Sequence, residues 1–388
     1  MDKIFNNTEI AFRTKSDSEL ERAYFLFRMI ANQPLVRIGT AVTNFAIKAH
    51  LPVEGLIRAT VFDHFCGGVN EKDCLKTVDA MYEVGVSSVL DYSVEGKETD
   101  KQFDDVTERT IKILEFVKEK DAIPFAVFKP TAIGRFDLYR KVGDEEKLSA
   151  EEKAEWDRVL KRFDLICKKA HDLDVALLID SEESWMQKAA DDVNEEMMRR
   201  YNKEKAIVYN TLQLYRWDRL DYLKELYAKA EKEGFYIGMK LVRGAYMEKE
   251  NDRAEEKGYP TPICASKKAT DDNYNETVHF IMERLDRIAV FLGTHNEDST
   301  YLMMRLMKEK GIPSNDPGIW FGQLYGMSDH ITFNLAANGY NVAKYLPFGP
   351  VRDVMPYLIR RAEENTSVAG QTTRELSLLT EERRRRKL

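Results

Sequence analysis

Short apolar runs alternate with longer charged stretches along most of the chain, from about residue 86 onward. The charged stretches place their apolar residues at helical spacing, so the alternation is typical of parallel strands covered by helices. Eight runs are candidate strands: Val86–Tyr92, Phe125–Lys129, Val175–Asp180, Ile207–Gln213, Tyr236–Arg243, Ile288–Thr294, Ile319–Tyr325 and Val342–Leu346. Since helix-like sequence follows each of them, we expect an α/β fold, a (βα)₈ TIM-like barrel.

A doubly wound open sheet is the main structural alternative to a barrel. Such a sheet normally has a glycine-rich turn after its first strand, where a dinucleotide phosphate binds. The chain contains neither a GxGxxG nor a GxxxxGK[ST] sequence. We therefore favour the barrel and expect any nucleotide to be held in another way.

Three regions are expected along the chain. Residues 1–84 have a helical pattern and form an N-terminal extension, residues 85–370 form the barrel, and residues 371–388 form a charged C-terminal tail. Two long charged stretches between strands, residues 137–156 and 247–272, are expected to be surface helices or loops.

Composition narrows the range of partners. A chain of 388 residues that is 43% hydrophobic can bury a large core, and its net charge of −7 argues against nucleic acid. The four cysteines form no CxxC pair, so a reducing cytoplasm fits best. The sequence shows no secretion signal, and no run reaches the roughly 20 apolar residues of a spanning helix.

Polar or charged side chains recur at the carboxyl ends of the candidate strands. They are Asp91, Lys129, Asp180, Gln213, Lys240 to Arg243, His295 and Tyr345. In a barrel these ends converge on one face, where active sites are built. A single one can be a solvated strand end, but the recurrence favours a site. His295 has no second histidine or cysteine at ligand spacing, so we expect no metal.

The last candidate helix contains the sequence YLIRRAEEN. At helical spacing Tyr357, Arg361 and Glu364 share one face, and Arg360 and Glu364 are an i,i+4 pair. Two interpretations stay open. The arginines form a structural pair with the glutamate, or they bind a carboxylate, whose geometry matches the planar donor fork of a guanidinium.

Nine short motifs follow one another along the chain: LDYSVE, FKPTAIG, LLIDSEES, NTLQLY, KLVRGAYM, GTHN, GQLYGM, YLPFGP and YLIRRAEENTS. In order and spacing they resemble the proline dehydrogenase family, from about Arg58 to Ser367. Each motif alone is weakly specific. Nine in order, on consecutive strand ends, are a specific resemblance.

The resemblance implies a distorted (βα)₈ barrel that holds FAD noncovalently and oxidises L-proline to 1-pyrroline-5-carboxylate. It implies catalytic roles for Asp180, Lys240 and Arg243. The substrate-binding residues that it implies are Lys129, Leu324, Tyr345, Tyr357, Arg360, Arg361 and Glu364. FAD would contact Ser181, Gln213, Lys240, Arg243, Gly244, Ala245, Thr294, His295 and Gln323.

The chemistry of proline agrees with these residue types. Its carboxylate must be neutralised when it leaves water, and Arg360, Arg361 and Lys129 supply the charge. Nearby cations also favour the neutral ring nitrogen that hydride transfer to flavin N5 requires. Lys240 or Arg243 would stabilise the anionic reduced flavin. Many bacterial relatives have arginine in place of Lys240, so which of the two contacts N5 stays open, and no general base is assigned.

Two further positions each have a functional and a structural interpretation. Gly244 permits the backbone to approach the cofactor closely, or it is an ordinary turn glycine. Asp91 and Glu95 form an acidic gate that pairs with Arg360, as the resemblance suggests, or they belong to a solvated loop.

Other activities remain as alternatives. One is oxidation of hydroxyproline or another cyclic or N-alkyl amino acid, although in the family the aromatic residue at Tyr345 crowds the carbon that would carry the hydroxyl. Another is a Schiff-base aldolase, because Lys129 and Lys240 could act as nucleophiles. A noncatalytic proline-binding protein would require an incomplete site, whereas the matched set is complete.

The resemblance also implies partners. Electrons would pass to a membrane quinone, and a separate pyrroline-5-carboxylate dehydrogenase would act on the product. A peripheral contact with the inner face of a membrane is expected from the tail sequence EERRRRKL. Near an anionic surface each Lys or Arg contributes about 1 kcal/mol. A solvated tail is the alternative.

Overall fold

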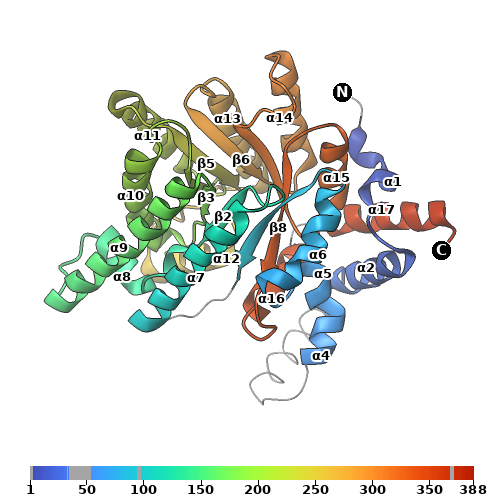
Figure 1. Ribbon diagram of the computed structural model, residues 1–388, viewed down its shortest axis with the longest axis horizontal. Helices are drawn as coiled ribbons and strands as arrows, with labels where there is room; N and C mark the ends of the chain where they lie inside the picture. The colour runs from blue at the N-terminus through green and yellow to red at the C-terminus, as the bar shows by residue number, and fades with distance from the viewer. Residues whose placement is uncertain (1–2, 33, 35–53, 94–97, 368–370) are drawn as a thin grey trace. The chain divides into compact units, whose positions relative to one another are not determined.

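The eight strands close into a barrel in the order β1 to β8 (Figure 1). The computed structural model describes residues 3–32, 34, 54–93, 98–367 and 371–388. The strands are β1 (Ser87–Tyr92), β2 (Phe125–Phe128), β3 (Ala176–Ile179), β4 (Val208–Gln213), β5 (Ile237–Val242), β6 (Ile288–Gly293), β7 (Ile319–Leu324) and β8 (Val342–Phe348). β1 pairs in parallel with β8, and each of β2 to β5 pairs in parallel with its successor.

The expected barrel is confirmed, with strand boundaries within two residues of the expected ones. The strands are buried nearly throughout, and β4 and β8 are buried along their whole length. Burial on both faces explains why the strands read as continuous apolar runs. Several polar residues that were assigned to strand ends each come directly after a strand instead. They are Lys129, Asp180, Arg243 and Thr294.

The chain divides into two compact units, one of residues Met1–Glu95 and Gly322–Leu388 and the other of residues Gly96–Phe321. The second unit contains β2 to β6 and these helices: α7 (Asp100–Lys118), the 3₁₀ turn η3 (Pro130–Ala132), α8 (Phe136–Gly143), α9 (Ala150–Leu173), α10 (Ser184–Tyr201), α11 (Arg219–Glu233), α12 (Met247–Lys257), α13 (Lys267–Met282) and α14 (Glu297–Glu309).

Local sequence explains where these helices begin and end. Capping boxes begin α7, through Thr99 and Gln102, and α9, through Ser149 and Glu152. Their side chains accept hydrogen bonds from backbone amides that have no partner within the helix. Gly234 ends α11 in the left-handed conformation that glycine adopts without a Cβ clash. As expected, the charged stretches 137–156 and 247–272 contain helices and loops, including α8 and α12.

The first unit contains β1, β8 and the helical ends of the chain. Its helices are η1 (Ile4–Asn6), α1 (Thr8–Ala11), α2 (Asp17–Ile30), α4 (Glu54–Ile57), the π-helix η2 (Arg58–Phe62), α5 (Asp63–Phe65), α6 (Glu71–Tyr82), α15 (Asp329–Ala337), α16 (Met355–Ser367) and α17 (Gln371–Arg386). The expected N-terminal helices are therefore present.

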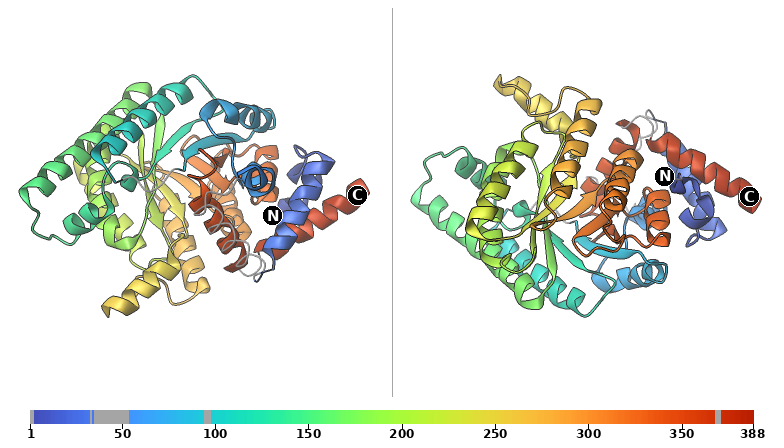
Figure 2. Two further views of the ribbon diagram at one scale, coloured as in Figure 1. Left: turned by 90° about the horizontal axis from the view of Figure 1, so that it is seen from below. Right: turned by 90° about the horizontal axis from the view of Figure 1, so that it is seen from above.

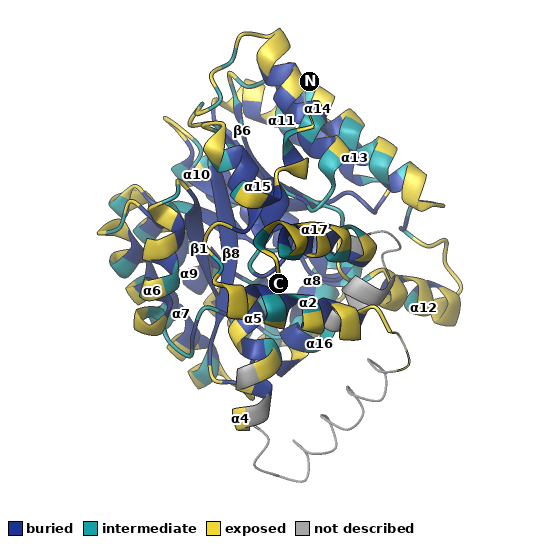
Figure 3. Cartoon of the chain, turned by 90° about the vertical axis from the view of Figure 1, so that its right-hand side faces the viewer, coloured by how far each residue is buried: buried dark blue, intermediate teal, exposed yellow. Residues whose placement is uncertain are grey.

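The C-terminal charged residues form α17, which lies against α1 and α2 (Figures 1 and 2). The contact is apolar, and Figure 3 shows exposed residues along the outer faces of α2 and α17. The buried cluster comprises Ala11, Phe12, Leu20, Ala23, Phe27, Leu378 and Leu379. Arg383 pairs with Glu21 at 2.6 Å, and Arg386 pairs with Glu382 at 2.7 Å and Asp17 at 3.0 Å. These contacts hold the tail in place as a helix.

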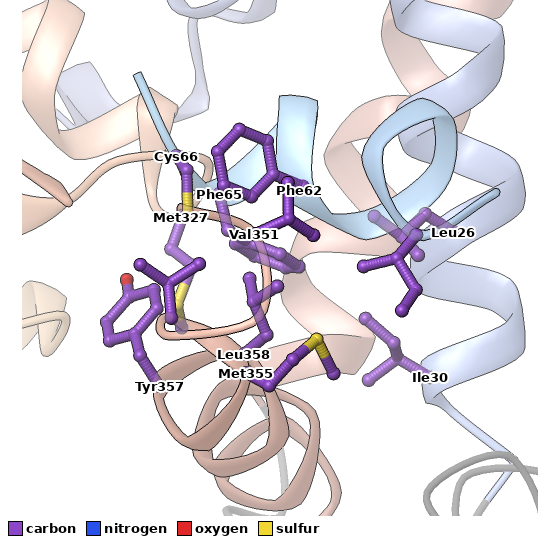
Figure 4. Close-up of a cluster of buried hydrophobic side chains, with 12 residues drawn as sticks. Leu26, Ile30, Phe62, Phe65, Cys66, Met327, Val351, Met355, Tyr357 and Leu358 are labelled. Atoms are coloured by element: carbon purple, nitrogen blue, oxygen red, sulfur yellow. The ribbon is translucent and has the colours of Figure 1, made fainter. Parts of the chain in front are cut away.

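A second apolar cluster joins α2, η2 and α5 to α16 (Figure 4). It contains Phe62, Phe65, Met327 and Tyr357, and Leu324 packs against it. Tyr357 and Leu324 are both candidate substrate contacts. The N-terminal helices therefore support the part of the first unit that holds these two side chains.

Candidate active site

Asp180, directly after β3, lies between Lys129, directly after β2, and Lys240, on β5. Its Oδ2 is 3.6 Å from Lys129 Nζ, and its Oδ1 pairs with Lys240 Nζ. The Lys240 side chain is 6% exposed, so this ion pair is largely removed from water. Two cations share one carboxylate, which leaves the cluster with positive charge. The structure thus brings together three residues that the sequence analysis selected.

The guanidinium of Arg243 is engaged at all three nitrogens. Nε donates to Asp271 Oδ1 at 2.8 Å, one terminal nitrogen donates to Thr294 Oγ1 at 2.8 Å, and the other donates to Ser299 Oγ at 3.0 Å. The group also lies 4.5 Å from the ring centroid of Tyr274. Arg243 is therefore held in one orientation, next to Thr294, another candidate cofactor contact.

Gly244 has a structural reason to be glycine. Its φ is +132°, which other residues rarely adopt, and a Cβ there would lie 2.5 Å from the ring of Tyr215. Gly244 and the following Ala245 are exposed, so their backbone is accessible. The close approach that glycine permits here is to Tyr215, while a cofactor contact of the same backbone stays a prediction.

Three further candidates of the second unit lie beside these residues along the chain. Ser181 follows Asp180 and donates to the carbonyl of Thr211, which ties β3 to β4. Gln213 is the last residue of β4 and is 3% exposed. His295 follows Thr294 and is half-buried. Among the described residues, no three His, Cys, Asp or Glu side chains are grouped as metal ligands would be.

The remaining candidates belong to the first unit. Arg361 is 6% exposed, and its guanidinium lies 5.1 Å from the ring centroid of Tyr357, one turn earlier on α16. The expected shared face of these two residues is confirmed. Arg360, beside Arg361, is half-buried. The side chain of Glu364 lies outside the described residues, so its pairing with Arg360 stays a prediction.

Tyr345, Leu324 and Gln323 lie on β8 and β7. Tyr345 is 7% exposed, and its carbonyl accepts a hydrogen bond of 2.8 Å from the amide of Tyr325. Gln323 is 2% exposed and accepts a hydrogen bond of 2.8 Å from the hydroxyl of Thr332. Leu324 is half-buried.

Of the two acids in the expected gate, the structure describes only Asp91. The Asp91 carboxylate accepts a hydrogen bond of 2.5 Å from the hydroxyl of Ser93 and is buried at the end of β1. Glu95 lies outside the described residues. Pairing of either acid with Arg360 stays a prediction.

Glu182, two residues after Asp180, was not predicted as a site residue from the sequence. Its carboxylate accepts hydrogen bonds from the amide of Thr131 at 3.1 Å and from the hydroxyl of Thr131 at 2.6 Å. Burial raises the pKa of Glu182 to about 7, against the opposing effects of Thr131 and Lys129. Both residues stand in quoted motifs, LLIDSEES and FKPTAIG, so the signal was present, but their contact joins positions 51 residues apart.

Glu182 should make stability depend on pH. Because the pKa is raised in the folded state, the stabilising contribution is complete below the ordinary value of 4.5 and is lost as pH rises through about 7. Glu182→Gln mimics the neutral acid at every pH. Chemical denaturation measures the unfolding free energy of this variant and of the parent at each pH. Between pH 4.5 and 8, the difference between them should change by roughly 3 kcal/mol in favour of the variant.

Glu183→Gln is the control for that experiment. It makes the same substitution at the adjacent residue, whose carboxylate pairs with Lys249 at 2.9 Å. A difference between Glu182→Gln and the parent that does not change with pH would show that Glu182 is already ionised in the folded protein.

A comparison with protein families identifies the chain. Residues 74–374 match the family model described as proline dehydrogenase. The chain belongs to the proline dehydrogenase family. The resemblance read from the nine motifs is confirmed, and the chain is an oxidoreductase whose reaction is the oxidation of proline to 1-pyrroline-5-carboxylate.

Two relatives illustrate the range of the proline dehydrogenase family. The carbapenem antibiotics biosynthesis protein CarD of Pectobacterium carotovorum is 36% identical over 90% of this chain and 91% of its own length. Mitochondrial proline dehydrogenase 1 of Arabidopsis thaliana is 33% identical over 97% of this chain and 85% of its own length. The similarity therefore extends through the helical ends as well as the barrel.

A solved structure supports the fold assignment. Proline utilization A from Bdellovibrio bacteriovorus, inactivated by N-propargylglycine, aligns with a TM-score of 0.72 at 20% identity. The alignment covers 95% of this chain and 39% of that one, so this chain corresponds in fold to a part of the longer protein. Within the described residues, no helix is long and apolar enough to cross a membrane.

Proposed function

We propose that the protein oxidises L-proline to 1-pyrroline-5-carboxylate with noncovalently bound FAD and passes the electrons to a quinone. The observation that carries the proposal is the family match over residues 74–374, which includes every residue of the proposed site.

The donor set of the second unit fits a flavin dinucleotide. Lys240 and Arg243 provide positive charge, which suits a pyrophosphate and a flavin ring that is reduced to an anion. Neutral hydrogen-bonding groups accompany them in Ser181, Gln213, Thr294 and His295. When bound, FAD supplies the acceptor for the hydride of proline. Arg243 is already oriented by Asp271, Thr294 and Ser299, so it needs little reorganisation to receive an anionic group.

The substrate carboxylate is bound by Arg360 and Arg361 on α16, with Lys129 as a further cation. Arg361 is buried against Tyr357, which limits its rotamers and removes competing water. Leu324 and Tyr345 form an apolar wall for the pyrrolidine ring, with Tyr357 beside them. A charged group in a fixed orientation and an apolar wall together select a small cyclic amino acid.

The cations of the site also favour the neutral form of the ring nitrogen, which is the form that can be oxidised. Asp180 balances Lys129 and Lys240 and fixes their positions through its two oxygens. We assign Asp180 this electrostatic and positioning role and assign no single residue as general base.

Anaerobic reduction tests the proposal directly. FAD-loaded protein should lose its visible flavin absorption on addition of L-proline, and NAD should not replace the flavin. Protein that binds no FAD, or bound FAD that L-proline leaves oxidised, would contradict the proposed function.

Two alternative activities predict other outcomes. A Schiff-base aldolase needs a lysine that is free to attack a carbonyl carbon, whereas the ammonium groups of Lys129 and Lys240 both lie against the Asp180 carboxylate. Borohydride trapping of a carbonyl substrate on either lysine would support that alternative. The variant Tyr345→Ser tests the other alternative, oxidation of hydroxyproline.

Tyr345→Ser should enlarge the space beside the substrate ring and raise kcat/KM for hydroxyproline relative to proline. Size discrimination in an apolar pocket is worth about 1 to 3 kcal/mol, so the ratio should change by roughly ten- to 150-fold. Steady-state kinetics with both substrates measure it. An unchanged ratio would show that Tyr345 does not contact the ring.

We propose that the protein meets its quinone acceptor through a peripheral contact with a membrane. A separate pyrroline-5-carboxylate dehydrogenase would act on the product. The tail contributes less to such a contact than its charge suggests, because Arg383, Arg385 and Arg386 pair with acids of the chain. Arg384, Arg385 and Lys387 are its exposed cations, and of these Arg385 pairs with Glu382. Vesicle sedimentation at low salt, with and without anionic lipid, tests the contact.

A further inference from the structure

The short loop between β7 and α15, residues 325–328, is held by buried charged groups that the proposed reaction does not use. The loop directly follows Gln323 and Leu324, and it turns back on itself, since the amide of Met327 donates to the carbonyl of Leu324 at 3.2 Å. The position of Leu324 therefore depends on what holds residues 326–329.

Lys344, on β8, is the central group of this arrangement. Its side chain is 1% exposed, and its ammonium contacts three oxygens of the loop region: the carbonyls of Leu324 and Met327 and, at 2.9 Å, Asp329 Oδ1. A buried ammonium requires such partners, because an unpaired one would be very costly in free energy. Lys344 thus attaches the turn to the strand that carries Tyr345.

Lys15, from the segment between α1 and α2, contacts the other oxygen of Asp329 at 3.1 Å. Burial alone would raise the pKa of Asp329, but Lys15 and Lys344 together lower it well below its usual range. Asp329 is therefore ionised, and it joins the N-terminal extension to the first residue of α15.

Glu375, on α17, contacts the loop from the C-terminal end of the chain. Its Oε1 accepts a hydrogen bond from the amide of Ser328 and lies 3.9 Å from His330 Nδ1. Ser328 has a φ of +51°, an uncommon conformation for a residue other than glycine. The carboxylate is 4% exposed, so its bond to the amide is shielded from water and helps to hold the backbone in this conformation.

His64, on α5, forms a third contact from outside the strands. Its Nε2 hydrogen-bonds the carbonyl of Gly326 at 2.9 Å. A Cβ on Gly326 would lie 2.3 Å from the carbonyl oxygen of His64, so the two backbones are as close as glycine permits. The N-terminal extension therefore holds Gly326, and the last helix holds Ser328, two residues further along the loop.

We propose that Glu375 is a positioning residue for the substrate site: through the Ser328 amide it fixes the turn that directly follows Leu324, and it thereby sets the selectivity of the site for the proline ring. The inference rests on the proposed function, in which Leu324 contacts that ring. From the other end of the chain, His64 holds Gly326 of the same turn, and Lys15 holds Asp329 directly after it.

Glu375→Leu tests the proposal, because it leaves the Ser328 amide without its acceptor. We expect KM for L-proline to rise about tenfold, because Leu324 would no longer be fixed beside the proline ring. The kcat/KM ratio of proline to the six-membered analogue pipecolate should fall, while the bound FAD per chain and kcat stay within about twofold. Glu375→Gln keeps an acceptor oxygen and should restore most of the selectivity.

Glu381→Leu is the matched control, since Glu381 is an exposed residue of the same helix. If Glu375→Leu does not fold, Glu375→Asp decides, because it keeps the charge but shortens the side chain by one methylene. An unchanged KM and an unchanged selectivity ratio in the folded Glu375 variants would overturn the proposal, as would equal changes in Glu381→Leu. Failure of the parent protein to reduce FAD with proline would instead count against the proposed function.

Discussion

Replacing Arg361 with methionine should raise KM for L-proline by roughly tenfold to 150-fold. Arg361 is 6% exposed, so its bond to a carboxylate would form away from water. A hydrogen bond to a charged group contributes about 1.5 to 3 kcal/mol, which corresponds to that range of affinity. Methionine keeps most of the apolar contact with Tyr357 and removes only the donor fork. Steady-state kinetics and proline titration of the oxidised flavin measure the effect.

Arg360→Met should weaken proline binding in the same direction, since the two guanidinium groups serve one carboxylate. Arg305→Met is the control, because the Arg305 side chain is 59% exposed on α14. If both α16 variants keep the KM of the parent, the arginines have a structural role and the carboxylate is bound elsewhere.

Replacing Lys240 with methionine should slow flavin reduction by about a hundredfold or more, which is the usual effect of removing one donor from a site of developing negative charge. Lys240 is the more buried of the two lysines at Asp180, and its ammonium has a fixed position there. Single-turnover reduction of the bound FAD by proline measures the rate without the second substrate.

Two companion variants interpret that result. Lys240→Arg keeps the charge and should retain most of the rate, whereas Lys268→Met, at a side chain 83% exposed on α13, should change nothing. A Lys240→Met protein that is reduced at the parental rate would assign the charge stabilisation to Arg243 instead.

Much of the barrel could be predicted because its signals are local. A strand buried on both faces, such as β4, needs an unbroken apolar run, and a covering helix such as α9 begins with a capping box four residues long. The candidate residues followed from the same pattern, since the carboxyl end of a strand is visible as the residue where the apolar run stops. This is why Lys129, Asp180 and Arg243 were found.

The contacts among those residues could not be predicted in the same way. The pairing of Asp180 with Lys240 joins positions 60 residues apart, and nothing in either motif shows that the other is near. Glu182 was missed because its neighbour Asp180 carried the family resemblance, while its raised pKa comes from burial, which the local sequence does not show.

By itself, the sequence determined the α/β class, the eight strands, the family and the residues at the strand ends, because each of these depends on residue types at short spacing. Only the tertiary structure showed that the last helix packs on α2 and that Glu375, Lys344 and Lys15 hold one loop. These groups are separated by up to 360 residues, and each reads as an ordinary charged position. Their role arises only when folding removes them from water, since a charge without solvent must find a partner wherever the chain brings one.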